Sequence, residues 1–293
     1  MVTLKNDVLQ VDLEPTGAEI SRIIGLQDGL NYMWKQDPVL WGHSAPVLFP
    51  IIGGLRNGTM THEGKTYKMG NHGFARNTVF GVDEQDDTHV VFHIHETEET
   101  LAQYPFCFDL YVTYTLEDNK LHTEFKVVNE RDDVIYFSIG GHPAFACPLI
   151  EGEDYNEYYI EMEQPETMSQ KVIDPSAGAA MLHEEKPLFE NERRLFVRQA
   201  PFSSDAIVLQ NMKSSYLTLK SLCNDKSVVF HMNNFLYCGL WTSKHAGGLL
   251  AIEPWNGHCD YIDYEGEFKD REGTRTLKKG EQFVCDFTVE INQ

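Results

Sequence analysis

Three short segments place a titratable side chain among glycines, prolines and aromatic residues. They are residues 71–76 (NHGFAR), 140–145 (GGHPAF) and 252–255 (IEPW). Together they supply two imidazoles and a carboxylate. An imidazole has an ordinary pKa of about 6.5, so it can give or accept a proton near neutral pH. The set suggests a site that moves protons on a sugar, whose C–H face would pack against the aromatic rings.

Two of these residues are candidates for an acid and a base. His142 follows two glycines and precedes Pro143, so the backbone can turn sharply and expose the imidazole. Glu253 ends an apolar run at residues 249–252, and partial desolvation there would raise its proton affinity and make it a usable base. Taken singly, His142 could also be a structural turn residue, and Glu253 could be an edge residue paired with a cation.

These segments, with residues 48–50 (LFP) and 56–59 (RNGT), resemble the aldose 1-epimerase (galactose mutarotase) superfamily. The likeness is greatest to its bacterial LacX-like branch, and it covers about residues 1–290. It implies a large antiparallel β supersandwich with an open cleft. It also implies interconversion of the α and β anomers of a free aldose, without a metal or an organic cofactor.

The resemblance also implies roles for individual residues. Glu253 corresponds to the general base and His142 to the general acid, which would open the sugar ring and close it again with the roles reversed. An ionised carboxylate and a protonated imidazole in one cleft would support each other's charged forms. We therefore expect the two side chains to face each other.

Five further residues are substrate-binding candidates. His72 corresponds to the family's second histidine, which orients the sugar. Arg56 corresponds to a substrate-binding arginine, although its spacing to the following glycine differs here. Asp205 matches, on a short motif, an aspartate that binds hydroxyls, but a lone aspartate before a strand is also a common turn former. Arg76 ends a shared His-Gly-x-Ala-Arg motif, and Trp255 offers a flat apolar face.

Three other functions remain open. A hexose-6-phosphate mutarotase shares the motif ending at Arg76, but an arginine expected shortly before the Phe-Pro pair is replaced by residues 42–46 (GHSAP). A non-catalytic sugar-binding sandwich would need no acid–base pair. A metal enzyme could use His93 and His95, which are two residues apart and so lie on the same face of a strand. It could also use His72, His142 and Glu253 as a site of two histidines and one carboxylate.

Composition limits the partners and the compartment. The formal charge of −21 disfavours nucleic acid and anionic membranes, which would repel the protein. The six cysteines form no C-x-x-C pair and no secretory leader is evident, so we expect reduced thiols in a soluble cytoplasmic protein. We expect a small-molecule sugar as the partner, and a monomer or homodimer.

Alternation with period two recurs along the chain and predicts an all-β fold in one domain, residues 1–293. The clearest hairpin joins residues 110–116 to 121–128, and another spans 59–69. Helix is expected only at 97–104 and, more weakly, at 190–197. The acidic stretch 151–192 lacks alternation, which favours an irregular surface excursion.

Overall fold

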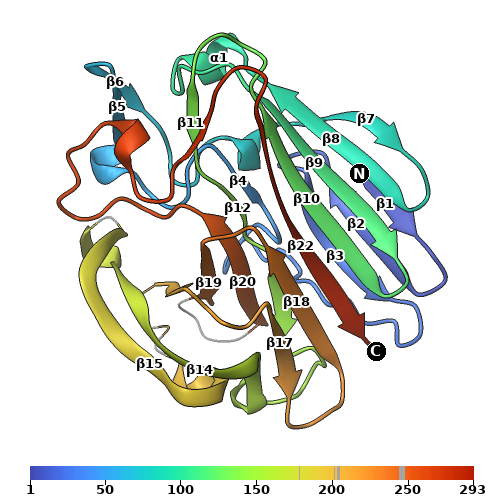
Figure 1. Ribbon diagram of the computed structural model, residues 1–293. Helices are drawn as coiled ribbons and strands as arrows, with labels where there is room; N and C mark the ends of the chain where they lie inside the picture. Colours follow the sequence, from blue (N-terminus) through green and yellow to red (C-terminus); the bar gives the residue numbers. More distant parts are fainter. Residues whose placement is uncertain (178, 201, 203–204, 244–247) are drawn as a thin grey trace.

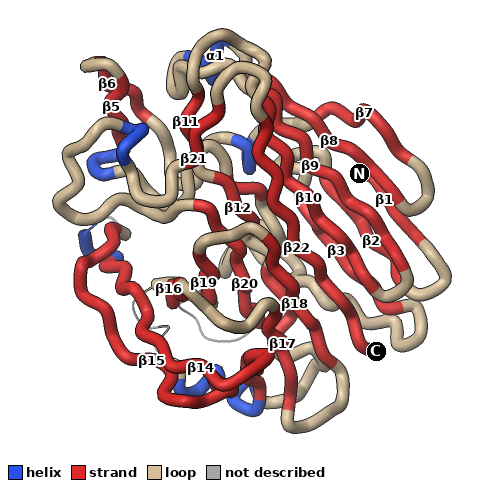
Figure 2. Tube along the Cα trace, viewed as in Figure 1, coloured by secondary structure: helices blue, strands red, loops and turns tan. Residues whose placement is uncertain are grey.

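The computed structural model describes residues 1–177, 179–200, 202, 205–243 and 248–293. The fold is all-β, as the sequence predicted, and the ladders between its named strands are antiparallel. Figure 2 shows long strands, with helix confined to short segments. Within the described residues, no helix is long and apolar enough to span a membrane.

The largest sheet has 15 strands and curves strongly. Figure 1 shows it bending from β7–β10 at the right, through β22 and β18, to β14 and β15 at the lower left. Its path runs β4 (Val47–Leu48), β12 (Ile139–Gly141), β20 (Gly248–Asn256), β19 (Tyr237–Trp241), β16 (Ile207–Gln210), β14 (Tyr158–Asp174), β17 (Tyr216–Ser221), β18 (Ser227–Asn233), β22 (Gln282–Asn292), β10 (Lys120–Val128), β9 (Asp109–Glu117), β8 (His89–His95) and β7 (Gly81–Gln85). Off this path, β13 (Ala144–Cys147) pairs with β20, and β15 (Ala180–Phe196) pairs with β14.

Smaller elements complete the fold. One sheet contains β1 (Val2–Lys5), β2 (Leu9–Glu14) and β3 (Glu19–Gly25), and two strand pairs are β5 (Thr59–His62) with β6 (Lys65–Lys68) and β11 (Ile135–Phe137) with β21 (Arg275–Leu277). The helices are α1 (Glu98–Leu101) and the 3-10 turns η1 (Arg56–Gly58), η2 (Ala75–Asn77), η3 (Tyr155–Glu157), η4 (Pro175–Ala177), η5 (Val197–Gln199) and η6 (Phe268–Asp270).

The main core lies between the β1–β3 sheet and part of the large sheet. Buried and less buried side chains alternate along β9 and β10, as expected for strands with one face on a core. Leu4 and Val11 of the small sheet belong to the same buried cluster as Val112 of β9. The Tyr114 hydroxyl also donates to the Ala18 carbonyl at 2.6 Å. These contacts anchor one end of the sheet that carries the candidate site.

Several local predictions are confirmed. The hairpin of β9 and β10 forms with Leu121 opposite Leu116, and β5 and β6 form the second hairpin. A single turn, α1, begins after Thr97, whose side chain accepts a hydrogen bond from the Thr100 N–H at 3.2 Å. All six cysteines are free, and four of them are buried.

Two local predictions are wrong. The predicted helix at 190–197 does not form, because residues 190–196 are the end of β15 and only Val197 is helical, as the first residue of η5. The predicted irregular excursion contains β14 and β15, each 17 residues long and paired with the other. Four register shifts interrupt their ladder, and much of β15 is exposed, so no simple alternation marks either strand.

Candidate active site

His142 lies in the short break between β12 and β13, and Glu253 lies opposite it on β20. β20 pairs with β12 before His142 and with β13 after it, in one continuous register. Since Gly140 pairs with Trp255, the same antiparallel register brings His142 across from Glu253. Cross-strand partners project from the same face of a sheet. The His142 Nε2 atom lies 3.2 Å from Glu253 Oε2, so the two side chains face each other, as expected from the sequence.

Two glycines allow the close approach around this pair. A Cβ atom on Gly140 would lie 2.6 Å from the Pro254 carbonyl oxygen, and one on Gly239 would lie 2.7 Å from the Trp255 ring. Both distances are too short for real atoms, so a larger residue would push the neighbours apart. Gly239 pairs with Glu253 across β19 and β20. Its missing side chain leaves room for the indole beside the carboxylate.

Burial controls the proton affinities of the pair. Glu253 is 1% exposed and His142 is 7% exposed. Burial raises the pKa of Glu253 well above its ordinary 4.5 and the Asp205 charge adds to this, while the Trp255 indole and Arg76 oppose it. Burial also lowers the pKa of His142 well below 6.5. Desolvation therefore favours the uncharged form of each group and opposes the mutual attraction of their charged forms.

Buried polar atoms at the centre of the site have unused hydrogen-bonding capacity. Among the described residues, neither carboxylate oxygen of Glu253 has a well-aligned hydrogen bond, and neither does Nε1 of Trp255. Leaving such buried groups unpaired costs about 1–3 kcal/mol each. The site thus retains hydrogen-bonding capacity that an entering hydroxylated molecule would satisfy.

His72 is held as a neutral hydrogen-bond donor. Its backbone has a φ of 64°, and its N–H donates to the Gly53 carbonyl at 2.9 Å. The Gly53 N–H in turn donates to Nδ1 of the imidazole at 3.1 Å. Burial, with Arg76 and His43, lowers the pKa of His72 to about 3. Because Nδ1 is an acceptor in this tautomer, Nε2 carries the hydrogen.

These groups line one cavity of about 300 Å³. That volume is at the small end of the range for ligand pockets, which suits a monosaccharide ring. The lining combines polar groups on a few side chains with an extensive apolar wall. It consists of Trp41, Ile52, Gly53, Asn71, His72, Arg76, His142, Ile173, Ala179, Asp205, Ala206, Trp241, Glu253, Trp255 and Cys259.

Six of the seven predicted site residues line this cavity: Glu253, His142, His72, Asp205, Arg76 and Trp255. Arg76 belongs to η2, and burial lowers its pKa while Glu19 and Glu253 act in the opposite direction. Asp205 directly precedes Ala206, whose N–H donates to Asp205 Oδ1 at 2.8 Å. Segments far apart in the chain therefore meet at one hollow.

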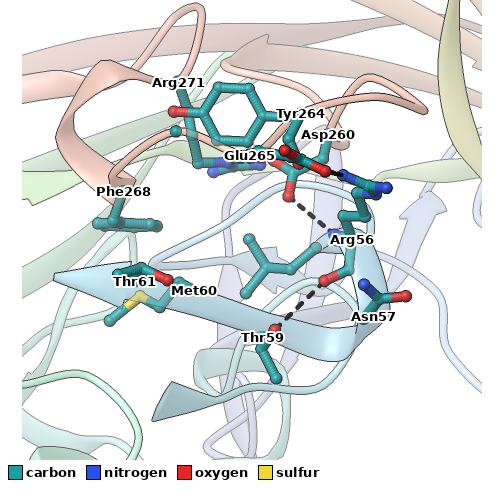
Figure 3. Close-up of a pocket in the computed structure, with 12 residues that line it drawn as sticks. Arg56, Asn57, Thr59, Met60, Thr61, Asp260, Tyr264, Glu265, Phe268 and Arg271 are labelled. Atoms are coloured by element: carbon teal, nitrogen blue, oxygen red, sulfur yellow. Dashed lines mark hydrogen bonds and ion pairs between the residues drawn. The ribbon is translucent and has the colours of Figure 1, made fainter. Parts of the chain in front are cut away.

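Arg56, the seventh predicted site residue, does not line this cavity. Its guanidinium contacts Glu265 Oε1 at 2.9 Å and the Tyr264 carbonyl at 3.1 Å, and its backbone N–H donates to Asp260 at 2.8 Å (Figure 3). It lines a separate hollow of about 240 Å³. Among the described residues, Arg76 is the arginine that lines the cavity.

Two tryptophans that sequence reasoning missed flank His142. The ring centroids of Trp41 and His142 are 4.6 Å apart, and the Trp241 ring meets His142 edge-on at 5.4 Å. Trp241 ends β19, two residues after Gly239, so strand alternation could have placed it on the face of Glu253. Trp41 lies outside the named strands, and no sequence pattern indicated it.

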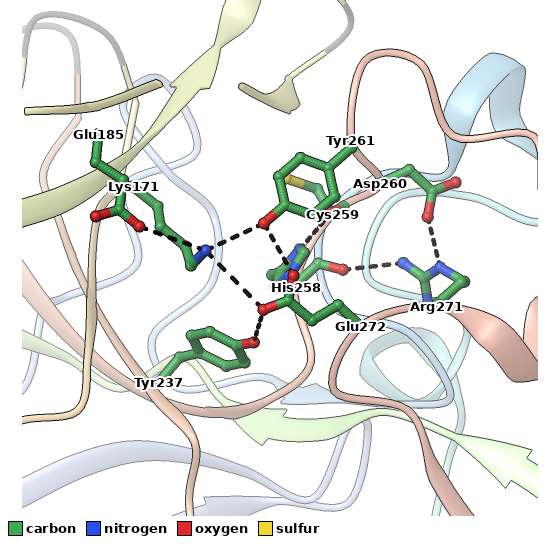
Figure 4. A network of polar contacts seen from close by, with 9 residues as sticks. All are labelled: Lys171, Glu185, Tyr237, His258, Cys259, Asp260, Tyr261, Arg271 and Glu272. Atoms are coloured by element: carbon green, nitrogen blue, oxygen red, sulfur yellow. Dashed lines mark hydrogen bonds and ion pairs between the residues drawn. The ribbon is translucent and has the colours of Figure 1, made fainter. Parts of the chain in front are cut away.

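A polar network supports the wall of the cavity on the side of Cys259 (Figure 4). Glu272 accepts hydrogen bonds from the hydroxyls of Tyr237, at 2.8 Å, and Tyr261, at 2.9 Å. Lys171 of β14 donates to the Tyr261 hydroxyl at 3.1 Å. These contacts join β14, which contributes Ile173 to the cavity, to β19 and to the segment after β20.

The alternative metal sites are not supported by geometry. His93 Nε2 is 2.9 Å from Asp109, and its Nδ1 is 3.3 Å from Asp83, so neighbouring carboxylates occupy both ring nitrogens. Among the described residues, no group of three or more histidine, cysteine, aspartate or glutamate side chains is arranged to hold a metal ion.

Comparisons with known proteins give a consistent result. A family model described as aldose 1-epimerase matches residues 1–281. The chain is 36% identical over 276 residues to the chromosomally encoded protein LacX of Lactococcus lactis subsp. lactis, covering 92% of each. A galactose mutarotase related enzyme from Lactobacillus acidophilus has a TM-score of 0.94 at 30% identity, covering 100% of this chain and 97% of that one.

A second solved structure, a galactose mutarotase-like protein from Lactobacillus casei ATCC 334, has a TM-score of 0.91 at 28% identity and covers 100% of both chains. The predicted resemblance is thus confirmed across the fold that positions His142 and Glu253. With the family model matching from the first residue to residue 281, this chain belongs to the aldose 1-epimerase family.

Proposed function

We propose that this protein is a mutarotase that interconverts the α and β anomers of a free aldose. Family membership supports an isomerase-type sugar enzyme. The observation that carries the proposal is the 3.2 Å approach of His142 Nε2 to Glu253 Oε2 in a monosaccharide-sized cavity. The sugar oxygens O1 and O5 are both bonded to C1, so an acid and a base that act on them must lie close together.

The proposed reaction passes one proton through each side chain. Glu253 removes the proton from O1 while His142 gives a proton to O5, and the C1–O5 bond breaks to leave an aldehyde. After rotation about C1–C2, O5 attacks the other carbonyl face, His142 takes back its proton and Glu253 returns a proton to O1. Each well-placed acid or base typically contributes about 10²–10⁴-fold in rate.

Burial favours the stage of the reaction at which the sugar ring is open. When the ring is open, Glu253 is protonated and His142 is neutral, which is the protonation state that desolvation stabilises in both groups. The charged pair, required when the closed sugar is bound, is the less favourable state. Proton transfer out of it therefore relieves a desolvation penalty and assists ring opening.

Other residues would hold the sugar. His72 would donate through Nε2 to a sugar oxygen, and Arg76 and Asp205 would bind hydroxyls. The indoles of Trp41, Trp241 and Trp255 would pack against C–H groups. A phosphosugar is less well supported, because a phosphate would share the described lining with two carboxyl groups and one arginine.

The direct test follows anomer equilibration by one-dimensional NMR, using freshly dissolved α-D-glucose, α-D-galactose and their 6-phosphates. The wild-type protein should accelerate equilibration of a free hexose. Glu253→Gln and His142→Asn should each lower kcat/KM at least 100-fold, because each removes one proton-transfer partner.

Two controls make this test decisive. Circular dichroism and thermal unfolding of both variants should match a folded protein, so that a lost rate reports chemistry. Wild-type rates in both folded variants would refute the assignment. Sugar binding without any wild-type acceleration would instead support a non-catalytic binding protein.

A further inference from the structure

The backbone around His142 is hydrogen-bonded on both of its edges. β20 lies along one edge, and β4 with the residues before it lies along the other. The N–H of His142 donates to the Pro46 carbonyl at 3.1 Å, and the N–H of Ala144 donates to the Ser44 carbonyl at 2.8 Å. The place of the His142 backbone therefore depends on residues 44–46 as well as on β20.

One buried carboxylate holds the start of that segment. Glu19 is the first residue of β3 and is 5% exposed. Its Oε1 atom accepts the N–H of Ser44 and, at 2.9 Å, the N–H of Ala45. Its Oε2 atom lies 3.2 Å from Nδ1 of His43. We call this set of contacts from Glu19 to residues 43–45 the Glu19 clamp.

The Glu19 clamp is anchored in the main core. The carbonyl of Ala18, the preceding residue, accepts the Tyr114 hydroxyl of β9 at 2.6 Å. The clamped segment also follows directly on the residues that carry Trp41, whose ring centroid is 4.6 Å from that of His142. The clamp thus connects the core to the backbone of His142 and to a ring that packs against its imidazole.

Loss of the clamp would displace the segment beside His142. Ser44 is 0% exposed and Ala45 is 6% exposed, so without Glu19 their N–H groups would be buried without this acceptor. Buried N–H groups require a partner, so the segment would shift toward water or toward another acceptor. The carbonyls of Ser44 and Pro46 would move with it, and the backbone of His142 would follow.

We propose that Glu19 is a positioning residue that places His142 for proton transfer through the Glu19 clamp. The inference rests on the proposed function, since it assigns Glu19 a part in placing the general acid. Glu19 is not among the described residues that line the cavity, so it acts through His142 and not on the sugar. It has a separate electrostatic effect on Arg76, because its charge opposes the lowering of the Arg76 pKa by burial.

The experiment compares Glu19→Ala with Glu19→Gln and measures kcat and KM for the free hexose that the wild-type protein turns over fastest. Both variants lose the charge that acts on Arg76, but the glutamine carbonyl can still accept the two N–H groups. Glu19→Ala should lower kcat about 10-fold to 100-fold, as a small misplacement of a reacting group does. Its KM should stay within about threefold of the wild-type value, because the groups that bind the sugar remain. Glu19→Gln should keep kcat within about threefold of the wild-type value, because the acceptor remains.

The matched control is Glu166→Ala. Glu166 of β14 is also buried, at 1% exposed, and its Oε1 atom accepts the consecutive N–H groups of Lys213, at 3.0 Å, and Ser214, at 2.8 Å. It does not line the cavity. Thermal unfolding should show that Glu166→Ala and Glu19→Ala are both destabilised, whereas kcat should fall only in Glu19→Ala.

Three results would overturn the proposal. They are a wild-type kcat in folded Glu19→Ala, an equal fall of kcat in Glu166→Ala, and a kcat in Glu19→Gln as low as in Glu19→Ala. The last result would assign the effect to charge. If Glu19→Ala does not fold, Glu19→Asp takes its place, because its shorter side chain withdraws the carboxylate from both N–H groups. Its kcat should then fall in the same way, and an unchanged kcat would contradict the positioning role.

Hydrogen exchange separates this inference from the proposed function. The amide proton of His142, which is donated to the Pro46 carbonyl, should exchange at least about tenfold faster in Glu19→Ala than in the wild type and in Glu166→Ala. An unchanged exchange rate would show that the Glu19 clamp does not hold His142. If the wild-type protein equilibrates no hexose, the mutarotase function fails, and the exchange rates still decide whether the clamp holds His142.

Discussion

His142 stands directly across from Glu253 in a ladder whose register is fixed on both sides. Gly140 pairs with Trp255 on one side, and on the other Ala144 pairs with Ala251. The distance between His142 and Glu253 is therefore set by the strand pairing on both sides of His142, which is more rigid than a loop. Changes that separate β12 from β20 should damage catalysis even where they touch neither titratable group.

Gly140→Ala should lower kcat by at least tenfold and destabilise the fold by about 1–3 kcal/mol. The added Cβ would lie 2.6 Å from the Pro254 oxygen, so the strands must shift. Gly81→Ala is the control, because its Cβ would meet nothing closer than the His93 oxygen at 3.6 Å. Equal rates and equal unfolding midpoints in both variants would show that the strand spacing does not matter.

The pH–rate profile should be bell-shaped with activity retained above pH 6.5. The working pair shares one proton. Burial lowers the pKa of His142, so the pair takes up a second proton, on His142, only well below pH 6.5. Burial raises the pKa of Glu253, so the pair loses its remaining proton, from Glu253, only well above pH 4.5. Measuring kcat/KM from pH 4 to 9 checks this. A narrow maximum near pH 5.5 would indicate that neither pKa is shifted.

Glu253→Gln should become more stable relative to the wild type as the pH rises. When the pKa of a group is higher in the folded than in the unfolded state, its contribution to stability is largest below the pKa of the unfolded state, which is 4.5 for Glu253. That contribution is lost as the pH rises through the pKa of the folded state. Glutamine does not titrate. The difference in Tm between variant and wild type should therefore grow from pH 4.5 upward, and a constant difference would argue against a raised pKa.

His72→Asn should raise KM about tenfold with a smaller effect on kcat. The imidazole is assigned to holding the sugar, and asparagine would lose a donor fixed by the Gly53 amide. Progress curves at varied sugar concentration give both constants. A large fall in kcat at constant KM would assign His72 to the proton transfers instead.

The sequence predicted the fold class and most of the site, and its errors have physical causes. Period-two alternation identified strands such as β9 and β10, which have one buried face. It missed β14 and β15, because bulges and exposure remove the alternation there. Glycine-flanked motifs located His72 and His142.

Long-range placement was harder to predict. Arg56 shares its segment with Gly53, which reaches the cavity, yet its side chain pairs with Glu265. Trp41 reaches His142 from a segment without regular strand pattern. The extent of desolvation at His142 and Glu253 could not be read from the sequence, because it depends on residues that the chain brings together only on folding.

The amide of Gly53 has a consequence for discrimination among sugar epimers. It occupies one nitrogen of the His72 ring, so the ring cannot flip to present that atom without breaking the contact. The other nitrogen can then only offer hydrogen, whatever the acidity of the medium. Nε2 of His72 would therefore bind only a sugar oxygen that accepts a hydrogen bond. An epimer whose oxygen points in another direction would lose this hydrogen bond at every pH.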